Sequence, residues 1–138
     1  MTWFGAASWF RTDGVIPVAR ESRGPVDVAA DAEWWNAFFK AAIGDVRQRV
    51  TFSLLGGSHD RANGTPVQRN TMEGGTAQVS YDGLHRAATV AARVSVSPNS
   101  FEQSFSTVGA GRATEVLTST QFTDSLTTRA IVEAGRTI

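Results

Sequence analysis

Two segments of the chain alternate between apolar side chains and polar or small ones. Residues 46–55 contain the run Arg-Val-Thr-Phe-Ser-Leu, which begins at Arg49, and residues 88–96 contain Thr-Val-Ala-Ala-Arg-Val-Ser-Val, which begins at Thr89. A period of two is typical of a β-strand that is covered on one face only. Both segments are therefore predicted to be strands with one apolar face and one face of arginines and hydroxyls.

The segment from Asp27 to Gly44 has a different spacing. Its apolar residues fall on one helical stripe, which consists of Val28, Trp34, Trp35, Phe38, Phe39, Ala42 and Ile43. Asp27 is suited to cap the start of a helix and Gly44 to end it. The spacing predicts an aromatic helix over residues 28–43. Its stripe needs a large apolar partner, either the core of this domain or another chain.

The remaining pattern predicts hairpins and further strands. Residues 3–20 predict a hairpin around the turn sequence Thr12-Asp13-Gly14, and residues 56–64 predict a polar loop. The pairs Gly74-Gly75 and Asp82-Gly83 predict tight turns on either side of residues 76–81. Residues 46–96 would then form an antiparallel meander.

The last forty residues are open to two interpretations. Asn99 and Glu102 have capping-box spacing, and a stripe that includes Phe101 and Phe105 favours a helix that is kinked near Gly109 and Gly111. Residues 114–122 also read as a strand, because they are rich in β-branched side chains. We expect the helix, followed by a second helix over residues 124–134.

Together these elements predict a single α+β domain over residues 1–138. It would consist of an N-terminal hairpin, a five-stranded antiparallel sheet, the aromatic helix over residues 28–43 and two C-terminal helices. A length of 138 residues with 41% hydrophobic residues suffices for one core. The sequence has no cysteine, which excludes a disulfide scaffold and a thiolate zinc site. It also lacks an apolar run long enough to cross a bilayer, so no membrane partner is expected.

No catalytic or metal-binding pattern stands out. His59 and His85 lie in turn or loop contexts without an i+4 partner or a nearby cysteine, and Gly109 and Gly111 lack the third glycine of a dinucleotide-binding loop. The serines carry no Gly-x-Ser-x-Gly elbow. We therefore expect no enzyme, no metal, no cofactor and no small-molecule substrate.

The predicted strands do suggest a binding surface. If helices cover the apolar side of the sheet, arginines and hydroxyls project together from the other side, namely Arg47, Arg49, Thr51, Ser53, Arg69, Thr89 and Arg93. Guanidinium groups suit phosphates, and small hydroxyl-lined spaces suit unstacked bases. The thirteen basic and thirteen acidic residues cancel, but that balance says nothing about one face. From the pattern alone, an ordinary solvated face with scattered arginines is the favoured alternative.

The order and spacing of these elements resemble the coat proteins of the single-stranded RNA bacteriophages, the leviviruses. Three patches agree with that family: Ala32-Glu33-Trp34 before the first long strand, Arg49-Val50-Thr51-Phe52-Ser53 within it, and Val94-Ser95-Val96-Ser97-Pro98-Asn99 at the end of the last strand. The aromatic helix, the short turn at Asp82-Gly83 and the glycines of the first terminal helix depart from the family pattern.

The resemblance implies an intertwined dimer whose terminal helices cross over the partner, and an icosahedral virion shell assembled in the host cytoplasm. It also implies that the inner sheet face binds single-stranded viral RNA and, in translational repression, an operator hairpin. Thr51 and Ser53 would match the hydroxyls of the family's adenine pocket, with Arg49 at the basic position before them. Arg69 and Arg93 would be further RNA contacts.

Two other functions are compatible with the same elements. One is a ring-forming phage protein of the head-to-tail or tail-terminator type, which binds no nucleic acid. The other is a small α+β ligand-binding or enzyme domain in which the aromatic helix closes an apolar pocket.

Overall fold

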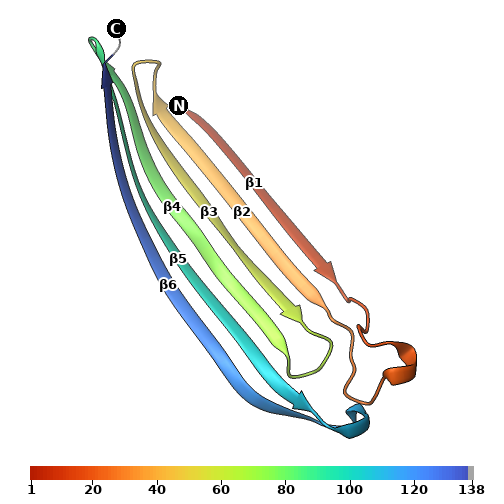
Figure 1. The fold of residues 1–138 in the computed structure, drawn as a ribbon. Coiled ribbons are helices and arrows are strands. Elements are labelled where there is room, and N and C mark those ends of the chain that lie inside the picture. Colours follow the sequence, from red (N-terminus) through yellow and green to blue (C-terminus); the bar gives the residue numbers. More distant parts are fainter. Residues whose placement is uncertain (137–138) are drawn as a thin grey trace.

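The computed structural model describes residues 1–136 and forms one six-stranded antiparallel sheet (Figure 1). The strands follow one another in chain order as β1 (Thr2–Thr12), β2 (Ala32–Gly44), β3 (Gln48–Ala62), β4 (Arg69–His85), β5 (Ala88–Val108) and β6 (Glu115–Arg136). The helical elements of the described chain are two 3-10 turns, η1 (Arg20–Ser22) and η2 (Ala110–Arg112). The predicted α+β class is therefore wrong, and the fold is all-β with six strands instead of five.

The predicted aromatic helix over residues 28–43 is largely strand β2. Trp34 and Phe38 lie on one face of the sheet, and Trp35 and Phe39 lie on the other. Residues four apart share a face in a strand as well as in a helix, so a stripe of such pairs does not distinguish the two. Large aromatic side chains favour the strand, since they pack well on a pleated surface.

The two predicted C-terminal helices are also strands. Residues 99–108 continue β5, and residues 115–136 form β6 along its whole length. Leu126, Ala130 and Ala134 have helical spacing but lie on one face of β6, again because they are four residues apart. With no such helices in the described chain, the intertwined dimer that depends on them has no counterpart in this fold.

The turns of the sheet differ from those predicted. β1 pairs with β2 across a loop of residues 13–31, so the predicted hairpin over residues 3–20 is wrong. Gly74, Gly75 and the pair Asp82-Gly83 lie inside β4, and the predicted loop over residues 56–64 is mostly the end of β3. The strands predicted at residues 46–55 and 88–96 are confirmed as parts of β3 and β5.

The sheet is a single layer with very long strands. β6 contains 22 residues, which corresponds to roughly 70 Å at about 3.3 Å per residue. The chain exposes 9675 Å², whereas a compact monomer of this mass exposes about 7,000 Å². The buried hydrophobic residues of the described chain are Val26, Ala32 and Ala62, all near one end of the sheet. An isolated chain therefore buries almost no hydrophobic core.

The loop of residues 13–31 closes that end of the sheet (Figure 1). Val28 donates its amide to the Gly64 carbonyl in the β3–β4 connection, at 3.0 Å. Val26 donates to the Arg112 carbonyl in the β5–β6 connection, at 3.2 Å. The loop is thus hydrogen-bonded to two other connections that lie far from it in the sequence.

Candidate nucleic-acid interface

Strand pairing determines which side chains share a face of the sheet. Thr51 lies opposite Ser80, and Ser80 lies opposite Arg93. Directly paired residues project to the same side, and every second residue along each strand does too. The face that carries Thr51, Ser80 and Arg93 is called the basic face below.

Five of the seven residues predicted to bind RNA project from the basic face, namely Arg49, Thr51, Ser53, Thr89 and Arg93. Arg49, Thr89 and Arg93 are not buried, whereas Thr51 is 8% exposed. The small side chains of Thr51 and Ser80 thus form a shallow depression in the basic face between longer side chains. The geometry brings these five residues together as the alternating pattern of β3 and β5 indicated.

Arg47 and Arg69 do not join this group. Arg47 lies in the β2–β3 turn, where its amide donates to Asp45 Oδ1 at 2.7 Å. Arg69 projects from the opposite face and forms ion pairs with Asp60 at 2.5 Å and Asp31 at 3.3 Å. Desolvation works to lower the pKa of Arg69, but its contacts with Asp60 and Asp31 raise it overall. Arg69 is thus held by carboxylates on the wrong face for this site.

Sequence reasoning missed four polar residues of the basic face. Lys40 pairs with Ser53, and Arg129 pairs with Ser95, so both cations flank the row of hydroxyls. Gln78 and Ser80 supply further polar groups between β3 and β5. Lys40 and Arg129 were hidden because their segments were predicted to be helices. If these segments had been predicted as strands, the alternation of side chains along each strand would have placed both residues on this face.

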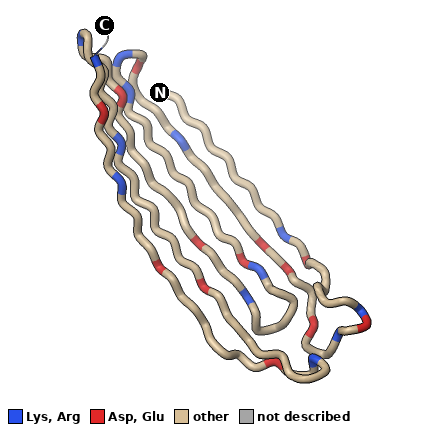
Figure 2. The backbone as a smooth tube through the Cα atoms, in the orientation of Figure 1, with Lys and Arg blue, Asp and Glu red and all other residues tan. Residues whose placement is uncertain are grey.

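The two faces of the sheet carry opposite charge. On the described strands, the basic face has five basic residues and two acidic ones, Lys40, Arg49, Arg61, Arg93, Arg129, Asp82 and Glu133. The opposite face has three basic residues and six acidic ones, Arg11, Arg69, Arg136, Glu33, Asp60, Glu73, Glu102, Glu115 and Asp124. Figure 2 shows how the charged residues are distributed along the strands. The net charge of zero therefore averages two unlike surfaces.

The opposite face also carries a broad apolar surface, called the apolar band below. It crosses all six strands near the chain termini and consists of Trp3, Phe39, Ile43, Val50, Phe52, Leu54, Val79, Val94, Val96, Leu126 and Val132. All of these side chains are exposed. A contiguous apolar surface of this extent is typical of a contact with another protein.

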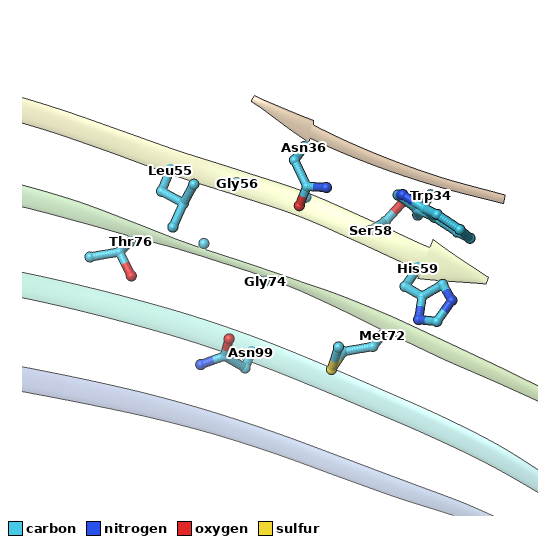
Figure 3. Close-up of a pocket in the computed structure, with 12 residues that line it drawn as sticks. Trp34, Asn36, Leu55, Gly56, Ser58, His59, Met72, Gly74, Thr76 and Asn99 are labelled. Carbon is cyan, nitrogen blue, oxygen red and sulfur yellow. The ribbon is translucent and has the colours of Figure 1, made fainter. Parts of the chain in front are cut away.

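The basic face has a hollow near its centre with a volume of about 510 Å³ (Figure 3). Its floor is the backbone of Gly57 and Gly74, which are directly paired. Asn36 on β2 and Asn99 on β5 lie on either side in the same row of the sheet. Further along the strands, the hollow is bounded by Leu55 and Thr76 at one end and by Trp34, His59 and Met72 at the other.

Among residues 1–136, no group of three or more His, Cys, Asp or Glu side chains is placed to hold a metal ion. His85 forms a hydrogen bond with the Tyr81 hydroxyl at 2.8 Å, and His59 lies edge-on to Trp34. No helix in the described part of the chain is long and apolar enough to cross a membrane.

Comparison with known proteins identifies no relative. No protein-family model matches the chain, and neither the curated proteins nor the solved structures contain a significant match.

Proposed function

We propose that this chain is a structural protein that assembles from many copies and binds RNA, as the capsid protein of an RNA bacteriophage does. Copies associate through the apolar band, and the basic face binds single-stranded RNA. The observation that carries the proposal is the pairing of an exposed apolar band on one face with a cationic, hydroxyl-rich surface on the other.

The surface area supports assembly. The chain exposes more than a third more surface than a compact monomer of its mass. Each copy must bury on the order of 2,000 Å² or more to reach ordinary compactness, which is the scale of obligate interfaces. Burial of one Phe or Leu side chain contributes about 1.5–3 kcal/mol, so the apolar band favours strong association.

The chemistry of the basic face supports RNA binding. Arg49, Arg93 and Arg129 provide planar donors that suit phosphate oxygens. The hydroxyls of Thr51 and Ser53 lie between these cations and the Lys40 ammonium, where sugar and base groups can be bound. Repulsion from the acidic residues is reduced, because most of them lie on the opposite face.

Assembly also compensates for the modest charge of one copy. The basic face has only three more basic than acidic residues on its strands. Many such faces on the inside of a shell bind one RNA molecule together, so weak individual contacts give a high overall affinity. We therefore propose the virion as the location of the protein.

Expression in a bacterial host followed by size-exclusion chromatography and electron microscopy tests the proposal. We expect particles of shell size that contain nuclease-protected RNA. Arg93→Ala should reduce the RNA content, whereas Arg11→Ala on the opposite face should leave it unchanged. Rings without RNA would instead favour a head-to-tail or tail-terminator type of protein. A small species without RNA would contradict both parts of the proposal.

A further inference from the structure

We infer that the hollow between Asn36 and Asn99 binds one unstacked nucleobase of the RNA. The inference rests on the proposed RNA-binding function and names a second contact area on the basic face. It lies apart from Thr51 and Ser53, since Gly57 is four residues from Ser53 on β3.

The glycines determine the shape of the hollow. A Cβ atom on Gly57 would lie 2.7 Å from Asn36 Oδ1, and one on Gly74 would clash with Asn99 Oδ1. Side chains at these positions would therefore displace both amides. Because both positions are glycine, the side-chain amides of Asn36 and Asn99 can lie close to the backbone of these glycines (Figure 3). The space above the glycine backbone is therefore not filled by a side chain. A volume of about 510 Å³ is within the range of small-molecule sites.

The lining matches the chemistry of a base. Each Asn amide carries both a donor and an acceptor, which is the pattern that base edges present. No Asp, Glu, Lys or Arg side chain lines the hollow, so it suits a neutral ring better than a phosphate. Leu55 and Met72 supply apolar contacts for the ring surface.

The aromatic wall of the hollow is held in place by its neighbours. Trp34 stacks on Phe10 with a centroid separation of 4.1 Å and meets His59 edge-on at 5.6 Å. A wall fixed in this way loses little freedom when a ring binds against it.

The surroundings provide for the rest of the nucleotide. Lys40 lies on the same face of β2 as Asn36 and four residues away, or roughly 13 Å along the strand. Arg129 is placed in the same way relative to Ser125, which pairs with Asn99. A base in the hollow therefore leaves the flanking phosphates within reach of two cations. This placement favours a nucleobase over a sugar or a peptide side chain.

The test compares two labelled probes with the same number of phosphates. One is an oligoadenylate of about eight nucleotides, and the other is an abasic ribose-phosphate chain of equal length. Fluorescence anisotropy measures their binding to the assembled protein after removal of host RNA. We expect the abasic chain to bind about tenfold more weakly, because it lacks the base contacts.

Variants locate the effect in the hollow. Asn36→Leu and Asn99→Leu should each weaken oligoadenylate binding about three- to tenfold and leave binding of the abasic chain unchanged. The control is Gln121→Leu, an exposed residue of the basic face that lies outside the hollow. Thermal unfolding of each variant verifies that the sheet is intact.

The outcomes separate this inference from the proposed function. Equal affinity for both probes, or unchanged oligoadenylate binding in both Asn variants, would overturn the base site while leaving RNA binding intact. Failure of the wild-type protein to bind either probe would overturn the RNA-binding function together with the hollow. Displacement of oligoadenylate by a neutral oligosaccharide at the hollow would identify a sugar site instead and would also overturn the inference.

Discussion

Asp27 and Arg112 are 85 residues apart in sequence and form an ion pair at the closed end of the sheet. Both carboxylate oxygens of Asp27 accept hydrogen bonds from Arg112 Nε at 2.8 Å, and Oδ2 also accepts one from the Gly24 amide at 2.7 Å. The Asp27 side chain is completely enclosed. This contact joins the loop of residues 13–31 to the connection between the last two strands.

The Asp27 pair makes stability depend on pH. The hydrogen bond from Arg112 lowers the pKa of Asp27 below its ordinary value of 3.8, and the Gly24 amide adds to this effect. A lowered pKa in the folded state stabilises the protein above the unfolded pKa, and this stabilisation is lost as the pH falls through the folded pKa. We expect Asp27→Asn to lower the Tm at neutral pH and to reduce the loss of stability below pH 4. Calorimetry between about pH 2 and pH 7 measures both effects. Asp13→Asn is the control, and an equal effect of the two substitutions would contradict this role.

Glu115 organises a second contact at the same end. Its carboxylate accepts hydrogen bonds from the hydroxyls of Thr65 and Ser106 and from the Val67 amide. Desolvation works to raise the pKa of Glu115, but these hydrogen bonds lower it overall. Glu115→Ala leaves three donors without their partner and should cost about 1–3 kcal/mol in the free energy of unfolding. Urea denaturation measures this loss. Glu102→Ala, at an exposed position of the opposite face, should change stability much less.

The apolar band should tolerate no charge at its centre. Phe52→Lys replaces an apolar side chain with an ammonium that cannot be buried between copies without a partner. We expect assembly to weaken by at least about 1.5–3 kcal/mol per copy, with a shift from particles to small species. Sedimentation velocity measures the distribution. Gln121→Lys on the basic face is the control, and particles of unchanged size with Phe52→Lys would show that another surface drives assembly.

The hydroxyls of Thr51 and Ser53 should affect RNA binding and not assembly. Thr51→Ala and Ser53→Ala remove hydrogen-bonding groups from the middle of the basic face, so we expect each to weaken binding of an RNA hairpin severalfold. Filter binding measures the affinity, and electron microscopy verifies that particles still form. Ser100→Ala on the opposite face should have no effect. Unchanged affinity in both hydroxyl variants would remove these residues from the site.

The sequence predicted the faces of two strands but not the class of the fold. Val50, Phe52 and Leu54 lie opposite Thr51 and Ser53 across the sheet plane, as a period of two requires. The aromatic and C-terminal segments were misread because residues four apart share a face in both structures. β2 is apolar on both faces, so strict alternation, the usual strand signal, is absent there.

The sequence also predicted only part of the candidate site. Arg49, Thr51, Ser53 and Arg93 were found because their strands alternate clearly. Arg69 was misplaced because the continuation of β4 through Gly74 and Gly75 fixes its face, and that continuation is not visible in the local sequence. Only the pairing of β4 with β3 reveals this register.

The meander order of the strands has a consequence for synthesis. Every pairing joins consecutive strands, and β4 and β5 are connected by only residues 86–87. The four hairpins formed by β2 to β6 can therefore form one after another as the polypeptide is synthesised. The first strand is the exception, since it must wait for residues 32–44. A finished sheet still buries almost no hydrophobic side chains. With the proposed assembly, we therefore expect its stability to rise with protein concentration, so that a lone nascent chain is the most vulnerable form of the molecule.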